Sequence, residues 1–328
     1  MTAAEIRRLA MRMEPRLRRA FLRAMSEHKG RFTVREVAAA IEAGNVQGLL
    51  ETIAPKAGTL IGYDEEIRAG YIAAGVAALA SVPNPPNRQL EIAFNARDPQ
   101  AVDFLQTISG DKITEIIDDQ RVMIQQSLAA SRAEGLGADQ IARNLIGRIE
   151  DGQRTGGVIG LHSRQVGYVD AARQELSDAA LMRNYLTRQR RDRRFDSVVK
   201  RAIRDGRALS QRDIERITGR YADRLLQLRA ETIARTETLT ALSAGQNEAM
   251  RQLIQQEGLR PEQVRKVWRT ASDSRVRDSH AFLNGDSVGA NERFANGLLY
   301  PHDPSGSPEQ VINCRCVAET RVDWLGNG

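Results

Sequence analysis

The carboxyl-terminal part of this 328-residue chain holds a small group of side chains of the types that bind metal ions. Cys314 and Cys316, the only two cysteines, are separated by one residue, and His280 precedes them. Thiolate and imidazole are ligands that zinc prefers, so these three residues are zinc-ligand candidates, with His302 or Asp303 as a further ligand. The C-x-C spacing differs from the usual C-x2-C spacing of zinc sites, and no fourth ligand is obvious from the sequence.

The pattern around the cysteines favours a second interpretation, in which they are small buried core residues. From Cys314 to Trp324 the residues alternate between two faces, which predicts a half-buried strand with both cysteines on its inner face. A disulfide framework is excluded, and a bridge between residues two apart on a strand would be strained. We therefore expect no bound cofactor, and zinc stays the alternative.

The segment WRTASDSRVRDSH, residues 268–280, is predicted to be a strand that leads into a short helix. Asp273 or Ser274 is placed to cap this helix, and Gly285 lies at a position typical of a C-terminal cap. Helical spacing would place Arg277 one turn from the histidine that ends the segment. Two such cations fit either an acid/base or anion-binding site, or a polar network that fixes a loop-rich domain. We favour the network, because a perturbed histidine alone is weak evidence for catalysis.

A hydrolase or transferase in the carboxyl-terminal region is the main competing hypothesis. It would use His280, Asp303, Glu309 and Cys314, with or without a metal ion, and it requires these side chains to converge on an open cleft. The sequence contains no Ser/His/Asp order, nucleophile elbow, phosphate-binding glycine loop or HExxH pattern. We therefore predict that the chain is not an enzyme.

Basic residues outnumber acidic ones, and the formal net charge is +6. Residues 183–207, which begin at Arg183 and end at Arg207, contain ten basic residues and three acidic ones. Such a stretch fits non-specific DNA contact, because several phosphate contacts bind DNA without reading its sequence. Tyr185 and Phe195 are its only aromatic residues for base stacking. A solvated helical stretch, or a surface that meets an acidic partner, is therefore the favoured explanation.

The amino-terminal residues 1–20 alternate between basic and apolar types and lack the uninterrupted apolar stretch of a signal peptide. No segment approaches the roughly 18 consecutive apolar residues of a membrane span. We therefore expect a protein that is made and used in the cytosol without membrane contact.

Helical periodicity dominates the chain before residue 258 and predicts an α+β protein that is predominantly α. Helices are expected at residues 6–27, 33–43, 64–80, 98–109, 112–134, 138–149, 159–180 and 210–257, with a short strand at 90–96 and turns at 81–88 and 151–157. Four regions are predicted, namely an N-terminal helical region (1–82), a helical region after the Pro-rich linker (83–157), a long-helix middle region (158–257) and a small C-terminal α+β domain (258–328).

The longest predicted helix carries Arg235, Thr236 and Glu237. Glu231 and Arg235 are four residues apart, which fits an ion pair on a solvated helix face. The alternative is that Arg235 or Glu237 turns toward the carboxyl-terminal domain and pairs with its polar cluster. The sequence leaves these two possibilities open.

Five short strings occur in a fixed order, namely ARTET, WRTASDSRVRDSH, LNG, YPHDPSG and NCRC. This ordered combination, within residues 230–317, resembles the phage head morphogenesis family typified by the phage Mu F protein. The matching positions are Arg235, Thr236, Glu237, Trp268, Asp273, Arg275, Arg277, His280, Gly285, Pro301, Asp303, Pro304, Glu309, Asn313, Cys314, Arg315 and Cys316.

The resemblance implies a minor head component that acts in procapsid assembly or DNA packaging. It implies contacts with portal, major capsid or scaffold subunits, in the host cytoplasm during assembly and then inside the procapsid or virion. A DNA-binding internal head protein is a further alternative. The residues expected to form a structural and docking network are Arg235, Glu237, Trp268, Asp273, Arg275, Arg277, His280, Asp303, Asn313, Cys314, Arg315 and Cys316.

Overall fold

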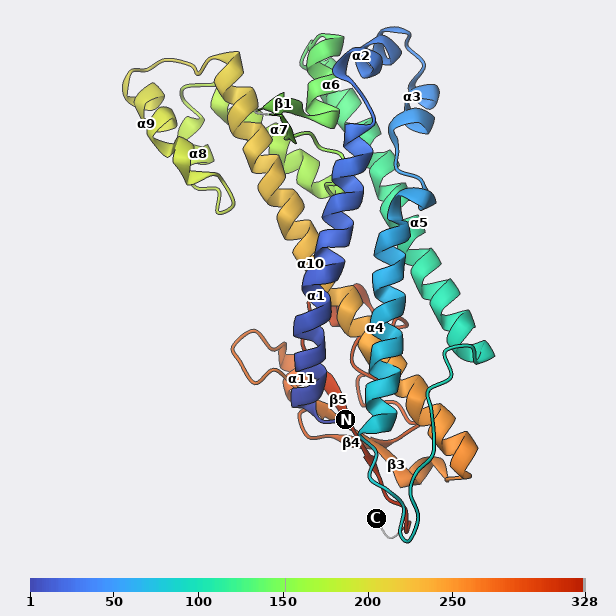
Figure 1. The fold of residues 1–328 in the computed structure, drawn as a ribbon. Coiled ribbons are helices and arrows are strands. Elements are labelled where there is room, and N and C mark those ends of the chain that lie inside the picture. The colour runs from blue at the N-terminus through green and yellow to red at the C-terminus, as the bar shows by residue number, and fades with distance from the viewer. Residues whose placement is uncertain (151, 327–328) are drawn as a thin grey trace. The chain divides into compact units, whose positions relative to one another are not determined.

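The computed structural model describes residues 1–150 and 152–326 and confirms a predominantly α-helical protein with small antiparallel sheets (Figure 1). Asp151, in the predicted turn at 151–157, and the last two residues of the region 258–328 lie outside the described residues. The α-helices are α1 (Ala3–Gly30), α2 (Val34–Glu42), α3 (Val46–Ile53), α4 (Ile61–Ala80), α5 (Pro99–Ala133), α6 (Ala138–Ile146), α7 (Ser163–Ser177), α8 (Met182–Tyr185), α9 (Asp196–Arg204), α10 (Gln211–Glu257), α11 (Asp278–Ala281) and α12 (Pro308–Val311).

The chain forms two compact units. Unit 1 contains residues 1–20, 62–111 and 231–328, and unit 2 contains residues 21–61 and 112–230. The unit boundaries fall within α1, α5 and α10. Both units combine segments that are far apart in the sequence, and the division into four contiguous regions stays a prediction.

Within unit 1, α4 and α10 approach each other along a seam of small residues. A Cβ atom added to Gly70 would lie 3.7 Å from the Cβ of Ala241, and one added to Gly245 would collide with the backbone carbonyl of Tyr71. Larger side chains therefore cannot be placed here without separating the helices. The seam consists of Gly70, Ala74 and Ala78 on α4 and Ala241, Gly245 and Ala249 on α10.

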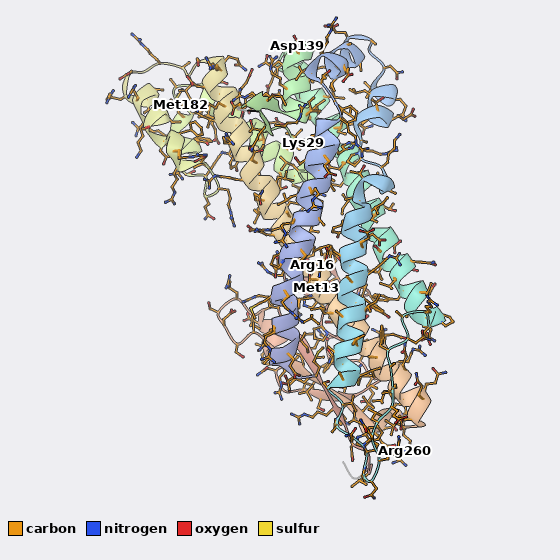
Figure 2. All side chains as sticks on the ribbon, viewed as in Figure 1. Met13, Arg16, Lys29, Asp139, Met182 and Arg260 are labelled. Carbon is orange, nitrogen blue, oxygen red and sulfur yellow. The ribbon has the colours of Figure 1, made fainter. Side chains whose placement is uncertain are left out.

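The first half of α1 packs on the same helices. Met13 and Arg16 both project from α1 (Figure 2). The Met13 methyl carbon lies 3.8 Å from the Cβ position of Gly70, and Arg16 forms an ion pair with Glu66 on α4 at 3.0 Å. The buried core of unit 1 thus includes apolar residues from α1, α4, α10 and the sheet that follows.

The carboxyl-terminal sheet has the strand order β4-β3-β5, and both pairings are antiparallel. The Gln246 side chain on α10 donates a hydrogen bond to the carbonyl of Ala318 at 2.9 Å, which ties β5 to the helix. The last pair of the β3–β5 ladder joins Arg269 to Val317, so β5 begins three residues after Cys314, where the predicted strand began. The strands are β1 (Arg148–Glu150), β2 (Gln153–Thr155), β3 (Val264–Arg269), β4 (Ser287–Gly289) and β5 (Val317–Val322).

The predicted strand at residues 90–96 is wrong. Residues 90–95 form no helix or strand, residue 96 lies in a turn, and Leu90, Ile92 and Phe94 pack against the unit 1 core. The Phe94 ring occupies the space that a side chain at Gly75 would need. The alternation of apolar residues therefore reflects packing on helices and not a sheet.

Several helix boundaries also differ from the prediction. The helix that begins at Pro99 continues through Gly110 to Ala133, because one exposed glycine costs a helix only about 1 kcal/mol. The predicted turn at 151–157 contains the second strand of a hairpin, in which β1 pairs with β2. The helix predicted at 159–180 begins at Ser163, since Gly160 adopts a φ of +96°.

Other helix signals are confirmed. Thr33 caps α2 by accepting a hydrogen bond from the Glu36 amide at 3.2 Å, and Glu36 accepts one from the Thr33 amide at 2.8 Å. Ser210 caps α10 by accepting from the Asp213 amide at 3.2 Å. Three short 3-10 helices complete the described elements, namely η1 (Ala57–Leu60), η2 (Arg193–Phe195) and η3 (Pro261–Gln263).

Replacement of Gly245 by alanine should destabilise the protein by about 2 kcal/mol or more, because the added methyl group must push α10 away from the Tyr71 carbonyl. Gly62→Ala is the control, since a Cβ at that exposed position on α4 meets no atom within 4 Å and should stabilise the helix by about 0.5–1 kcal/mol. Urea unfolding of both variants measures the effect. Equal stability of the two variants would contradict the close packing.

Candidate functional site

The carboxyl-terminal part of unit 1 is built on a small apolar cluster with Trp268 at its centre. The Trp268 ring packs edge-on against Phe294, with ring centres 5.0 Å apart, and against His280, with ring centres 5.3 Å apart. The buried residues of this cluster are Trp268, Leu283, Phe294, Leu298, Cys314 and Cys316.

His280 and the two cysteines face one another within this cluster. The Nδ1 atom of His280 lies 3.5 Å from the Sγ of Cys314 and 3.7 Å from the Sγ of Cys316. All three side chains are buried, and their candidate ligand atoms lie within 4.8 Å of one another. Both cysteines are free thiols. The structure thus brings together the three zinc-ligand candidates, and both cysteines point inward as predicted.

His302, in the loop before α12, lies next to this group, beside Cys314. It is fully buried, and its backbone adopts a left-handed φ of +69°, which is uncommon for a residue other than glycine. Neither of its ring nitrogens has a hydrogen-bond partner of normal geometry among the described residues. Strained backbone of this kind often occurs at functional positions.

The two thiols differ in their protonation. The pKa of Cys314 is lowered, first by a hydrogen bond from Cys316 and then by His280 and His302, which outweigh its burial. The pKa of Cys316 is raised, first because its thiol donates to Cys314 and then because it is buried. The two shifts thus share their largest cause, the hydrogen bond from the Cys316 thiol to Cys314.

The carboxylates of the competing enzyme hypothesis do not join this group. Asp303 folds back on its own loop, where Oδ1 accepts from the Ser305 amide at 2.9 Å and Oδ2 accepts from the Leu299 amide at 2.8 Å. Glu309 is exposed on α12, whereas His280 is enclosed. In the described part of the chain these side chains do not form the open cleft that the enzyme hypothesis requires.

The predicted capping role of Asp273 or Ser274 is wrong, because α11 begins later, at Asp278. Asp273 instead binds both terminal nitrogens of the Arg315 guanidinium, at 2.5 and 2.6 Å, and accepts from the Arg275 amide at 3.0 Å. Arg315 holds the pKa of Asp273 down, to about 2. This pair fixes the loop after β3 to the residue between the two cysteines.

Arg277 and Gly285 each donate a hydrogen bond to a backbone carbonyl of another segment. Arg277 is the residue before α11, and its guanidinium donates to the Ile312 carbonyl at 2.5 Å. Gly285 has a φ of +93°, and its amide donates to the Trp268 carbonyl at 2.8 Å. Gly285 therefore closes a turn onto β3, and the prediction that it caps the short helix is wrong.

Residues of α10 hold the segment that leads into the cysteines. Arg235 donates to the Asn313 side chain at 3.3 Å, and Thr236 accepts from the Asn313 amide at 3.1 Å. Arg235 also pairs with Glu14 at 3.5 Å. Of the two possibilities for Arg235, the structure favours the turn toward the carboxyl-terminal cluster.

Glu231 and Glu237, the acidic residues near Arg235 on α10, contact other parts of unit 1. Glu231 pairs with Arg18 at 3.5 Å. Glu237 is buried and lines a small cavity in unit 1 together with Tyr71 and Ser109. Glu237 thus lies apart from the thiol cluster, by which we mean His280, His302, Cys314 and Cys316.

Lys266 is a buried cation that the sequence analysis missed. Its ammonium group donates to the carbonyls of Glu292 at 2.9 Å and Leu299 at 2.7 Å, and burial lowers its pKa to about 8. The alternation of β3 places Lys266 on the same face as Val264 and Trp268, which is the signal that would have found it.

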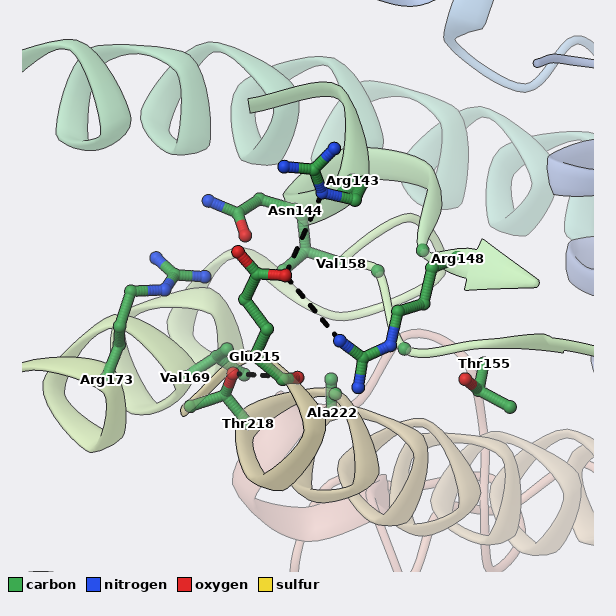
Figure 3. A pocket seen from close by; sticks show the side chains of 14 residues that line it. Arg143, Asn144, Arg148, Thr155, Val158, Val169, Arg173, Glu215, Thr218 and Ala222 are labelled. Atoms are coloured by element: carbon green, nitrogen blue, oxygen red, sulfur yellow. Dashed lines mark hydrogen bonds and ion pairs between the residues drawn. The ribbon is translucent and has the colours of Figure 1, made fainter. Parts of the chain in front are cut away.

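Unit 2 contains a polar cavity that the sequence also did not indicate (Figure 3). Glu215 of α10 lies 3.6 Å from Arg148 and 3.8 Å from Arg143 at this cavity, and Arg173 projects toward it from α7. Its volume of about 30 Å³ is close to that of one water molecule and too small for a substrate.

The basic stretch at residues 183–207 folds into α8, η2 and α9, and part of its charge is neutralised within unit 2. Ion pairs join Arg188 to Glu175 at 2.7 Å and Arg194 to Asp192 at 2.6 Å. The exposed basic residues without an acidic partner within 4.0 Å in the described structure are Arg183, Arg190, Arg193, Lys200, Arg201 and Arg207.

Comparison with known proteins supports the resemblance. Residues 193–319 match the model of a family described as Phage Mu protein F like protein. This match confirms the predicted resemblance to the phage head morphogenesis family. The matched region includes all of α10, the residues His280, His302, Cys314 and Cys316, strands β3 and β4, and the first half of β5.

A curated relative is the "Uncharacterized protein YqbB" of Bacillus subtilis (strain 168), which is 31% identical over 135 residues. The alignment covers 39% of this chain and 41% of that protein, so the chain spans well under half the length of the relative it matches. No solved structure matches the chain significantly. Among the described residues, none of the helices is both long and apolar enough to cross a membrane.

Replacement of Thr236 by valine should cost about 1–2 kcal/mol, because it removes the acceptor for the Asn313 amide and leaves that group without a partner. Thr240→Val is the matched control, since Thr240 is one turn further along and equally buried but donates only to a carbonyl of its own helix. Chemical unfolding compares the two. A larger loss for Thr240→Val would contradict this role of Thr236.

The contribution of Asp273 to the stability of the folded protein should depend on pH. Because the pKa of Asp273 is lowered in the folded protein from 3.8 to about 2, its contribution is present above the higher value and is lost as the pH falls through the lower one. The difference in unfolding midpoint between wild type and Asp273→Asn should thus narrow between about pH 4 and pH 2. Glu91→Gln, at an exposed position, should show no such narrowing.

Proposed function

We propose that this protein is a minor head component of a tailed bacteriophage, which acts in procapsid assembly or DNA packaging by binding portal or shell subunits. It would act in the host cytoplasm during assembly and inside the procapsid or virion afterwards. The family match over residues 193–319 supports this proposal. The observation that carries it is the arrangement of matched polar residues such as His280, Asp303 and Asn313, which are enclosed or bonded to backbone or to α10 and thus give the module its shape.

The best candidate for a binding surface on this module is the exposed end of α11. Phe282 follows α11 directly and is 90% exposed, although it is a large aromatic side chain. Ile312, whose carbonyl is held by Arg277, is also exposed. Aromatic anchors that become buried on binding supply most of the affinity of protein interfaces, while surrounding arginines, such as Arg275, govern encounter and specificity.

Capture of the tagged full-length chain from cells in which phage heads assemble should recover portal, major capsid or scaffold subunits. Phe282→Ser should reduce this recovery about tenfold or more, because loss of an interface aromatic costs at least 1–2 kcal/mol. Leu325→Ser is the control, since Leu325 is also apolar and 67% exposed. Both variants should unfold at the wild-type denaturant concentration.

Absence of all three kinds of subunit from the wild-type capture would contradict the proposed function. If Phe282→Ser leaves the recovery unchanged, the binding surface lies elsewhere on the protein. DNA contact through residues 183–207 stays a prediction, supported by the six exposed basic residues without an acidic partner in the described structure. Such contact would show steep dependence on salt concentration.

A further inference from the structure

The thiol cluster contains more unsatisfied polar atoms than a buried region normally tolerates. Among the described residues, three buried ring nitrogens have no hydrogen-bond partner of normal geometry, namely Nε2 of His280 and both nitrogens of His302. A buried polar group without a partner costs several kcal/mol, so such groups are rare and call for an explanation. Two cysteines in the same place add two further potential ligand atoms.

The distances fit a tetrahedral metal ion. For zinc with Zn–S bonds of about 2.3 Å and Zn–N bonds of about 2.0 Å, neighbouring sulfur and nitrogen ligands lie about 3.6 Å apart. The Nδ1 atom of His280 lies 3.5 Å from the Cys314 sulfur and 3.7 Å from the Cys316 sulfur. A hydrophobic contact between these groups would not require the nitrogen to face both sulfurs at once.

Of the two further ligands considered from the sequence, His302 and Asp303, the structure favours His302. Its ring lies beside Cys314, and both of its nitrogens are available for a metal bond. Asp303, the other candidate, is already used, because both of its carboxylate oxygens accept hydrogen bonds within its own loop. The left-handed backbone at His302 also has an explanation if a metal bond holds the ring inward.

We propose that His280, His302, Cys314 and Cys316 bind one zinc ion as a structural site. Two thiolates and two imidazoles are the ligand set of many structural zinc sites, and the softness of sulfur disfavours magnesium and calcium. His280, Cys314 and Cys316 already lie at ligand spacing, and a bound ion would draw in His302, which lies beside Cys314, to close a four-ligand shell with no position for water or substrate. The site is therefore a structural centre, and it is independent of the proposed assembly function.

Outer contacts support the same four residues. The Cys316 amide donates to the Cys314 sulfur at 3.4 Å, and the Trp268 ring stacks edge-on against His280. Arg315, between the cysteines, is held by Asp273. Partners of this kind orient ligands and tune the charge on a coordinating sulfur.

The zinc ion would join three segments that share little apolar surface. His280 comes from α11, His302 from the loop before α12, and the cysteines from the segment before β5. The apolar cluster of this region contains six buried residues, two of which are the cysteines themselves. Metal binding thus supplies stability that the small core lacks.

The full-length chain, purified under reducing conditions, loaded with zinc and desalted, should retain about one zinc ion per chain. Cobalt in place of zinc should give the visible absorption of tetrahedral cobalt and a thiolate charge-transfer band in the near ultraviolet. A chelator should remove both bands, expose the two thiols to a thiol reagent and lower the unfolding midpoint.

Variants identify the ligands. His302→Gln and Cys316→Ser should each weaken metal binding by more than about a hundredfold, beyond the 10–100-fold that outer contacts contribute. His162→Gln, at an exposed histidine of unit 2, should bind zinc as the wild type does. His302→Cys should keep the metal and strengthen the charge-transfer band, which a purely structural role of His302 does not predict.

The proposal is overturned if the wild-type chain retains no metal, or if its cobalt form lacks the thiolate band. If His302→Gln retains zinc fully, His302 is not a zinc ligand. If a variant fails to fold, the cobalt spectrum of the wild type and its response to the chelator still decide the outcome.

Discussion

The shape of the carboxyl-terminal module depends on polar cross-links, because its apolar cluster is too small to hold it. Among the described residues, the apolar cluster centred on Trp268 has six buried members, and it lies between irregular loops, two short helices and a three-stranded sheet. Each loop is instead fastened by a charged or polar side chain to a backbone group or an opposite charge. Asp273 with Arg315, Asp303 within its loop and Lys266 with two carbonyls are examples. Asp303 and Lys266 are buried, so removing either side chain leaves polar partners unsatisfied, whereas the Asp273–Arg315 pair lies nearer the surface.

Helix α10 connects this module to the helical part of unit 1. One stretch of the helix fits against α4 through residues so small that the two backbones nearly touch, as at Gly245. Nearby positions carry Thr236 and Gln246, which bind the backbone at Asn313 and Ala318. The same helix therefore meets one neighbour by close packing and the other by hydrogen bonds. The family match includes the whole of α10 together with most of the carboxyl-terminal module that this helix supports.

Local signals in the sequence predicted the local features well. The capping box of α2, the long α10 and the inward cysteines follow from spacing within one segment, and the structure confirms them. The predictions failed where a contact with a distant segment of the chain determines the local structure. The alternation at residues 90–96 serves packing on helices, and Asp273 is taken by Arg315, 42 residues further along the chain. His302 was only one of several possible ligands, because a loop sequence does not indicate which side chain turns inward.

The order of segments in unit 1 determines when it can form during synthesis. Its first segment ends at residue 20, and the last begins at residue 231, with the whole of unit 2 between them. The amide of Ala3, at the start of α1, is bound by Glu319 of β5 at 3.2 Å. The first turn of α1 must therefore wait until the segment that contains Glu319 has left the ribosome. Unit 2 can fold earlier. Until the last segment of unit 1 is made, the apolar side of residues 3–20 of α1 stays open to chaperones and to other chains.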